Sequence, residues 1–303
     1  MEREGAGDIL TELEHAAGAA NRGRRMLKAS AVIAVLLAVA ILALSLRSEE
    51  PSGTWSALAP GLDLGSFATG RAGPGGDGSV TVLRIAPGSW RMEILCAAAD
   101  SAGGSLSAKE WCRREGLVAA TNAGMFATDH RTHIGYLKSD AHVNSARLNA
   151  YQSVAVFSPS RPGLPLFRII DLDASPAPID SLRRGYTQIV QNLRLVKRPR
   201  ENRWEEKDER WSEAALGEDG AGRALFIFSR TAYSMREFNE VLMKLPIDLV
   251  CAQHLEGGPE AQLYVNAGGL ELELVGGFET SFDESGTNRT AWPVPNVIGI
   301  SRP

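Results

Sequence analysis

An uninterrupted apolar segment near the start of the sequence constrains this chain more than any other feature. Residues 29–46 read ASAVIAVLLAVAILALSL and contain no charged side chain. A helix of this length rises about 27 Å, which is close to the thickness of the apolar layer of a bilayer. Because the segment has no polar face, it does not fit a helix that packs against a soluble core. The sequence therefore predicts a transmembrane helix over residues 29–46.

The charges on either side of this segment set its expected orientation. The basic residues before it are Arg22, Arg24, Arg25 and Lys28, and the charged residues after it are Arg47, Glu49 and Glu50. Since basic flanks stay in the cytoplasm, we expect residues 1–28 to form a cytoplasmic tail and residues 47–303 to be extracytoplasmic, either periplasmic or extracellular. A cleaved signal peptide is the alternative, with Ala43-Leu44-Ser45 as a weak cleavage site.

The rest of the chain has the composition of a globular protein. Hydrophobic residues make up 44 % and charged residues 22 % of the sequence, which excludes a disordered chain and a coiled-coil rod. A net charge of −4 gives no electrostatic reason to expect a nucleic acid partner. Three cysteines cannot form a disulfide framework. Cys96 and Cys112 could pair in an oxidising compartment, whereas we expect Cys251 to be a buried apolar residue.

Turn-forming residues dominate residues 51–78, so we expect a linker over residues 47–77, in which a first strand could begin near Leu62. The domain that follows, residues 78–303, is predicted to belong to the α+β class. We expect a mixed, many-stranded β-sheet as its core, together with two or three helices.

Local patterns predict the individual elements of this domain. The pairs Ser107/Glu110 and Ser234/Glu237 have the spacing of capping boxes, which begin helices. The turn Pro87-Gly88 predicts a hairpin between the first two strands. Apolar runs rich in β-branched residues predict strands at 79–85, 90–98, 117–124, 152–159, 165–172, 189–196, 223–229, 247–256 and 271–277.

Three short stretches end apolar strands with residues that are able to do chemistry. They are TNAGMF at 121–126, FSRT at 228–231 and HLEGGP at 254–259. An amide, a guanidinium and a carboxylate could face a cleft there, and paired glycines let a ligand approach the backbone. Each stretch also fits a structural role, namely a tight turn, an exposed strand end and a polar turn before a helix that begins at Pro259.

Taken together and in order, these stretches resemble the phosphodiester glycosidase family. The resemblance covers roughly residues 78–301, and its motifs are TNAGMF (121–126), FSRT (228–231), LEGGPEAQLY (255–264) and PVPNVIGI (293–300). Two positions depart from the family pattern. Glu256 replaces the aspartate before the paired glycines, and Glu213 opens the stretch EAALG where the family often has Arg-Thr-Ala-Ile-Gly.

The resemblance implies roles for individual residues. Glu256 would be the base or nucleophile at the anomeric carbon, Asn122 would hold sugar hydroxyls or the attacking water, and Arg230 would bind the phosphate. Glu213 is the candidate for a second catalytic carboxylate. The separation of the two carboxylates would decide between retention and inversion. The expected substrate-binding residues are Gly124, Gln191, Arg194, Ser229, His254, Gly257 and Gly258.

Other chemistries fit the sequence less well. Cys251 and His254 would lie on opposite faces of one strand, which is poor geometry for a thiol nucleophile and its base. A loop with Asp129, His130, His133 and His142 could hold a metal but has no matching ligand spacing. We therefore expect neither a metal nor another cofactor. Trp204 and Trp211, in a charged stretch, could stack on sugar rings or pack onto the domain.

The sequence leads to two function hypotheses. In the first, the chain is a membrane-anchored extracytoplasmic hydrolase that cleaves a sugar from a glycosyl phosphodiester or a related cell-envelope glycan. In the second, it is a catalytically inactive glycan-binding or scaffold module of the cell envelope. Both imply a carbohydrate or sugar-phosphate ligand and contact with the membrane through one N-terminal helix. The oligomeric state is left open.

Overall fold

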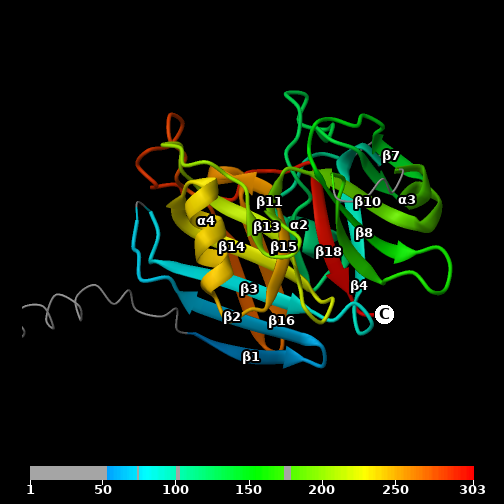
Figure 1. The fold of residues 1–303 in the computed structure, drawn as a ribbon, viewed down its shortest axis with the longest axis horizontal. Helices are drawn as coiled ribbons and strands as arrows, with labels where there is room; N and C mark the ends of the chain where they lie inside the picture. Colours follow the sequence, from blue (N-terminus) through cyan, green and yellow to red (C-terminus); the bar gives the residue numbers. More distant parts are fainter. Residues whose placement is uncertain (1–52, 74, 100–102, 174–178) are drawn as a thin grey trace, which may run out of the picture. The chain divides into compact units, whose positions relative to one another are not determined.

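From residue 53 onward, the chain folds into three antiparallel sheets in the computed structural model (Figure 1). The structure describes residues 53–73, 75–99, 103–173 and 179–303, which belong to the compact unit Glu50–Pro303. The predicted cytoplasmic tail, the transmembrane segment and the first part of the linker lie outside the described residues. Among the described residues, no helix is both long and apolar enough to cross a membrane.

Sheet A has eight strands and forms one wall of the fold. Its order is β1 (Gly53–Ala59), β2 (Leu62–Ala68), β3 (Ser79–Ile85), β14 (Ala224–Tyr233), β13 (Trp211–Asp219), β15 (Leu249–Gly257), β11 (Arg194–Lys197) and β12 (Glu201–Asn202). The strand expected near Leu62 is confirmed by β2, whereas β1 corrects the prediction of a linker over 47–77, because the sheet already begins at Gly53. Sequence patterning missed β1 because none of its side chains is fully buried and most are exposed, as is usual for an edge strand.

Sheets B and C have five strands each. Sheet B runs β17 (Leu270–Val275), β16 (Gln262–Ala267), β5 (Ala119–Asn122), β18 (Asn296–Ser301) and β4 (Arg91–Cys96). Sheet C runs β7 (His142–Ser145), β6 (Leu137–Ser139), β10 (Tyr186–Asn192), β8 (Ser153–Pro159) and β9 (Phe167–Asp171). Every described pairing is antiparallel, so the expectation of one mixed sheet is wrong, whereas the α+β class is confirmed.

Three described α-helices accompany the sheets: α2 (Ala108–Glu115), α3 (Ile179–Gly185) and α4 (Met235–Lys244). Both predicted capping boxes are present, since Ser107 and Ser234 each accept from the backbone N–H three residues on. Helix α2 stops at Gly116, which adopts the left-handed conformation with φ 70°. Two short 3₁₀ turns, η1 (Ala97–Ala99) and η2 (Gly258–Glu260), complete the fold.

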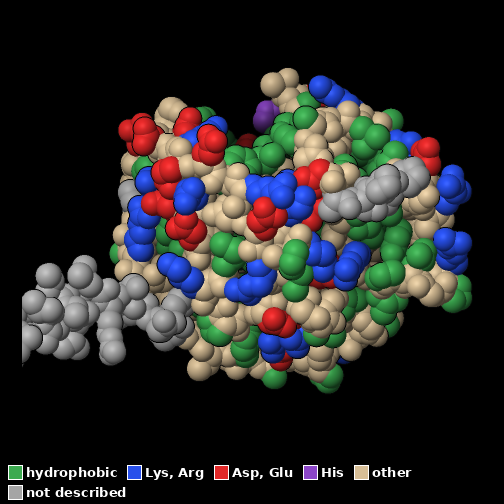
Figure 2. All heavy atoms as spheres, in the orientation of Figure 1, with side chains coloured by type: hydrophobic (Ala, Val, Ile, Leu, Met, Phe, Trp, Pro, Cys, Tyr) green, Lys and Arg blue, Asp and Glu red, His purple; other side chains and the backbone are tan. Residues whose placement is uncertain are grey.

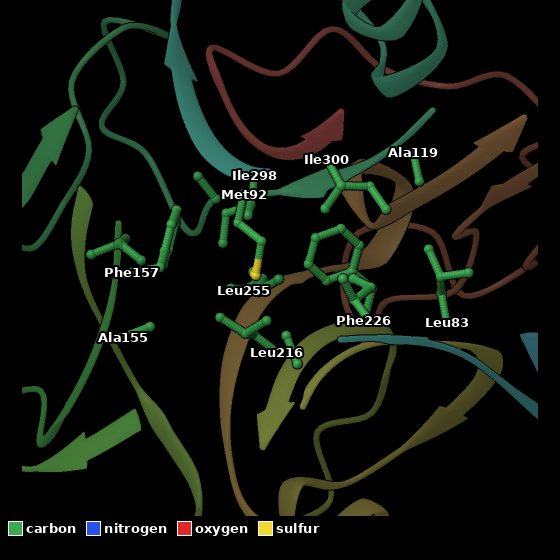
Figure 3. Packing of buried hydrophobic residues seen from close by; sticks show 14 of the residues in the cluster. Leu83, Met92, Ala119, Ala155, Phe157, Leu216, Phe226, Leu255, Ile298 and Ile300 are labelled. Atoms are coloured by element: carbon green, nitrogen blue, oxygen red, sulfur yellow. The ribbon is translucent and has the colours of Figure 1, made fainter. Parts of the chain in front are cut away.

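The main core lies where the three sheets meet. Figure 3 shows Leu216, Phe226 and Leu255 of sheet A packing toward Ile298 and Ile300 of sheet B and Phe157 of sheet C. A second apolar cluster lies between sheet A and α4 and includes Phe238, Leu242 and Tyr233. The central strands β13 and β15 are therefore covered on both faces.

The predicted hairpin at Pro87-Gly88 is wrong. Strand β3 pairs with β2 and β14 in sheet A, whereas β4 pairs with β18 in sheet B. The turn is thus a corner between two sheets, and Trp90 is buried there with its Nε1–H donating to the Pro60 carbonyl. Turn composition alone does not distinguish a corner from a hairpin, because both need a sharp change of direction.

Candidate functional site

The ends of β13 and β15 bring Glu213, His254 and Glu256 together. In the register of these strands, Ala214 lies opposite Glu256 and Ala215 opposite His254, with a β-bulge between the two pairs. The bulge adds a residue to β15 and places polar side chains at the end of an apolar strand. All three side chains are buried: Glu213 is 2 % exposed, His254 4 % and Glu256 8 %.

Glu213 and His254 form a hydrogen-bonded pair. Nδ1 of His254 lies 2.5 Å from Oε1 of Glu213, and the Trp211 indole N–H donates to Oε2 of the same carboxylate at 2.6 Å. Burial alone would lower the pKa of His254, but the Glu213 carboxylate raises it above its usual value, with Glu256 and Glu279 acting in the same direction. The imidazole is thus oriented and favoured in its protonated form, while Nε2 makes no hydrogen bond to a described residue.

Glu256 is a carboxyl that burial keeps protonated. Desolvation raises its pKa to about 8, against the opposing effect of His254 and the N–H of Gly257, which donates to Oε1 at 3.2 Å. The negative charges of Glu260 and Glu213 add to the rise. A carboxyl with this pKa is mainly a proton donor at neutral pH, which argues against the predicted role of nucleophile or base in its resting state.

Two loops flank these residues. Glu260 interacts electrostatically with Glu279, after β17, and with His130, after β5. Glu279 in turn interacts with His254. Figure 2 shows the surface hollowed between the regions where Figure 1 places these two loops. Tyr151 also lies near the site. Desolvation is the main cause of the raised pKa of its phenol, and the charge of Glu256 adds to it.

The paired glycines allow the backbone to pass close to its neighbours. A Cβ on Gly257 would lie 2.7 Å from Cδ1 of Trp211, and one on Gly258 would lie 2.5 Å from a carboxylate oxygen of Glu279. Gly258 also has φ +61°, which larger residues rarely adopt. The missing side chains of these two glycines thus let Trp211 and Glu279 pack against the end of β15. No contact in the described structure marks either glycine as a substrate-binding residue.

Asn122 lies next to the site but is occupied by the backbone. Its Nδ2 donates to the Glu260 carbonyl and its Oδ1 accepts from the Gln262 N–H, both at 2.8 Å. The amide therefore fixes the end of η2, the 3₁₀ turn that begins at Gly258. The role expected for Asn122 as a ligand of sugar hydroxyls or water would use the second N–H and the second lone pair of this amide, because each polar atom has one backbone partner.

Gly124 and Gln191 also serve the framework. Gly124 has φ +141°, and a Cβ there would lie 2.0 Å from Oδ1 of Asn192, so only glycine permits that approach. Gln191 uses both ends of its amide: Nε2 donates to the carbonyls of Asn149 and Tyr151, and Oε1 accepts from the N–H groups of Tyr136 and Asn149. Gln191 thus holds the loop that carries Tyr151, and it is not available as the predicted substrate ligand.

Arg230 does not point at the three clustered residues. It donates to the carbonyls of Gly75 at 2.6 Å and Gly286 at 3.0 Å, and also to those of Val275 and Asn288. It lines a separate cavity of about 670 Å³ that includes none of Glu213, His254 and Glu256. In the structure Arg230 thus ties the loops around β17 to sheet A, and its predicted role as a phosphate ligand stays a prediction.

The remaining predicted ligands are likewise engaged elsewhere. Ser229, which pairs with Glu213 across β13 and β14, donates its hydroxyl to the Thr231 carbonyl. Arg194 forms ion pairs with Asp171 at 3.3 Å and Asp173 at 2.7 Å. Of the predicted site residues, the structure thus brings together Glu213, His254, Glu256, Gly257 and Gly258.

Neither the loop histidines nor the cysteines form a reactive centre. Among residues 53–303 as described, no group of three or more His, Cys, Asp or Glu side chains is arranged to hold a metal ion. Burial lowers the pKa of His133 to about 4, and its Nε2 lies 2.9 Å from the Gln191 carbonyl. Cys96, Cys112 and Cys251 are free and buried, so the predicted Cys96–Cys112 pairing is wrong, and burial raises the pKa of each thiol to about 12.

Sequence reasoning missed several residues of this site. The sequence predicts only sugar stacking or packing for Trp211, yet this residue donates to Glu213 and covers Gly257. Glu279 and Tyr151 come from loops whose sequences carry no motif. Glu260 stood inside the stretch LEGGPE and could have been singled out by its distance of four residues from Glu256.

Comparison with known proteins was made on both sequence and fold. The model of the family described as phosphodiester glycosidase matches residues 115–301, more than half of the chain. The match includes all four motifs that suggested this family. A search of curated proteins gave no match.

Two solved structures have a similar fold. The first is the zebrafish N-acetylglucosamine-1-phosphodiester α-N-acetylglucosaminidase catalytic domain, auto-inhibited by its pro-peptide, with TM-score 0.57 and 12 % identity over 84 % of this chain and 89 % of that one. The second is a hypothetical protein from Synechocystis, with TM-score 0.55 and 16 % identity over 85 % of this chain and 65 % of that one. At these identities the likeness concerns the fold alone.

Proposed function

The chain belongs to the phosphodiester glycosidase family, and on that premise we propose that it is a hydrolase that cleaves a sugar from a glycosyl phosphodiester or a related cell-envelope glycan. The observation that carries this proposal is the buried Glu256 carboxyl, with its pKa raised to about 8, beside the Glu213–His254 pair. Perturbed carboxyl groups of this kind are typical of catalytic sites.

Two groups of the site, Glu256 and His254, suit an anionic substrate. A phosphodiester carries a negative charge, which an ionised Glu256 would repel, whereas the protonated carboxyl can donate a hydrogen bond to it. The His254 imidazolium, held by Glu213, offers the positive charge that Arg230 does not supply. Fixed donors placed where charge develops are an effective form of transition-state stabilisation.

Each of these side chains would have a separate role in the reaction. Breaking the bond between the anomeric carbon and the phosphate oxygen leaves negative charge on the departing phosphate monoester. Glu256 would give its proton to that oxygen, and His254 would stabilise the remaining charge. Glu279, a half-buried carboxyl on the flanking loop, would orient the attacking water and accept its proton, since it interacts electrostatically with the same imidazole.

We place this activity outside the cytoplasm and at the membrane. The support is the apolar run of residues 29–46 with basic residues before it, which is the pattern of a signal anchor. The substrate would then be a sugar phosphodiester or glycan of the cell envelope.

The test is hydrolysis by the full chain, purified in detergent. A panel of sugar-1-phosphodiesters, including nucleotide sugars, would be followed by release of the free sugar and of the phosphate monoester. We expect turnover of at least one substrate, and a loss of about 10²–10⁴-fold in Glu256→Gln. Glu115→Gln, an exposed carboxylate paired with Arg114, is the matched control and should keep full activity. Glycan binding without turnover on the whole panel would favour the inactive binding module instead.

A further inference from the structure

A small pocket next to the site is built around two tryptophans. It has a volume of about 170 Å³ and is lined by Trp204, Glu205, Lys207, Glu209, Trp211 and Met235. Trp204 and Trp211 also pack against the apolar cluster between sheet A and α4, which fixes the inner edge of each ring. The two tryptophans can thus pack onto the domain and still offer an aromatic surface to a sugar ring.

Hydrogen bonds fix both indoles in place. Nε1 of Trp204 donates to the Arg194 carbonyl at 2.9 Å, and Nε1 of Trp211 donates to Glu213 at 2.6 Å. With their N–H groups bound, the rings offer a ligand only their π-systems. The faces of such rings are weakly negative and attract C–H groups that carry partial positive charge.

The rim of the pocket carries exposed polar groups without partners. Glu205, Lys207 and Glu209 make no hydrogen bond or ion pair with any residue that the structure describes. Two carboxylates and one ammonium provide acceptors and donors side by side. A ring with C–H groups on its faces and hydroxyls at its edge matches this combination, and that description fits a sugar.

Trp211 connects the pocket to the candidate catalytic residues. Its ring lies 6.4 Å from that of His254, its indole N–H donates to Glu213, and it lies against Gly257. Trp204 also lines a second hollow of about 270 Å³, together with Ala150 and Gln152, the neighbours of Tyr151. The pocket and the candidate catalytic residues thus share Trp211, and the two hollows share Trp204.

We propose that the pocket between Trp204 and Trp211 is a carbohydrate subsite, which binds a second sugar ring of the substrate whose phosphodiester is cleaved at Glu256. This inference rests on the proposed function for the identity of that substrate. Ligand pockets usually measure about 300–1,000 Å³, so the smaller volume here suits a single ring. The substrate would then be a glycan phosphodiester with at least two sugars.

The test measures binding separately from catalysis. Full chain carrying Glu256→Gln, in a detergent without sugar headgroups, would be titrated with N,N′-diacetylchitobiose, cellobiose and maltose by ligand-observed NMR. We expect saturable binding of at least one disaccharide. Trp204→Leu should weaken it about tenfold, whereas Trp204→Phe, which keeps an aromatic face, should weaken it less than about threefold. Trp55→Phe, on edge strand β1, is the control and should bind as the parent does.

The other possible results would overturn either the carbohydrate subsite or the proposed hydrolase activity. Equal binding by the parent and Trp204→Leu, or no disaccharide binding at all, would overturn the subsite. Binding of tetramethylammonium that Trp204→Leu abolishes would assign the pocket to a cationic group and overturn it as well. If Trp204→Leu loses disaccharide binding while the wild-type chain hydrolyses no phosphodiester, the subsite stands and the proposed hydrolase activity fails.

Discussion

Burial sets the protonation state of Glu256, and a pH profile would reveal it. Because desolvation raises the pKa of this carboxyl to about 8, the proton donor is present below that pH and is lost as the pH rises through it. We expect kcat/KM to fall about tenfold per pH unit above about pH 8. The residual rate of Glu256→Gln should not show this fall. A rate that increases through the same range would instead assign Glu256 as a base or nucleophile.

The same carboxyl makes stability depend on pH. In the unfolded chain it titrates near 4.5, whereas in the folded protein it titrates near 8. Below about 4.5 both states hold the proton and nothing is lost. Between the two values the unfolded state releases its proton first, so stability falls as the pH rises, and the loss is complete above about 8.

Replacing Glu256 with Gln should therefore stabilise the protein at neutral pH. The expected gain in the free energy of unfolding is up to about 3 kcal/mol at pH 7 and close to zero at pH 4. Thermal unfolding of the two proteins across this pH range would measure it, with Glu115→Gln as a control that changes stability little at any pH. A variant that is less stable than the parent at pH 7 would show that Glu256 is ionised and paired.

Glu213 is expected to act through His254. Without its carboxylate, burial would lower the pKa of the imidazole, and His254 would lose its charge at neutral pH. We expect Glu213→Gln to raise KM for an anionic substrate at pH 7 by about tenfold, and the defect to diminish toward pH 5 as the imidazole is protonated again. Measurements of KM against pH would check this. A defect that is equal at every pH would mean that Glu213 only supports the fold.

At the scale of secondary-structure elements, Arg230 joins parts of the chain that are far apart in sequence. It donates to backbone carbonyls before β3, at the end of β17 and in the loop that follows. Arg230→Lys offers fewer donors in a different geometry and leaves some of these carbonyls unsatisfied. We expect a loss of about 2–4 kcal/mol in unfolding free energy and faster proteolysis of residues 275–290.

The KM of Arg230→Lys distinguishes the two roles of this residue. A clamp predicts little change in KM for the phosphodiester in the fraction of protein that stays folded. A large rise in KM with unchanged stability would restore the role of phosphate ligand. Arg289→Lys, whose guanidinium also donates to the carbonyls of Gly286 and Asn288 but is exposed, is the matched control.

Local sequence patterns predicted the individual strands and helices better than they predicted which strands pair with each other. Strand β3 and both capping boxes were predicted because they depend on neighbouring residues only. The run at 189–196 was predicted as one strand, but it divides at Leu193 into β10 of sheet C and β11 of sheet A. Which sheet a strand joins depends on contacts distant in sequence, and apolar periodicity does not encode them.

The site was predicted in part for the same reason. The stretch HLEGGP placed Glu256 at a strand end, and the bulge that brings it beside Glu213 arises only when β13 and β15 pair. Asn122, Gln191 and Arg230 have the side chains of ligands, but the backbone groups that occupy them come from other segments. Residue type alone does not reveal whether a polar group is already satisfied.

For the whole molecule, the proposed activity depends on where the chain is placed in the cell. A membrane anchor would hold the site near substrates of the envelope, and only six residues, 47–52, separate the apolar run from the start of β1 at Gly53.

We expect the full chain to remain in the membrane fraction after alkaline extraction, because the apolar run can span the bilayer. Added protease should reach residues 53–303 only from the extracytoplasmic side, since the basic flank keeps the N-terminus inside. Replacing Arg22, Arg24, Arg25 and Lys28 with glutamate should disturb this orientation, whereas lysine at the three arginine positions should preserve it. Intact mass measurement tests the competing signal peptide: a mature chain that begins near Ser45 would overturn the anchor.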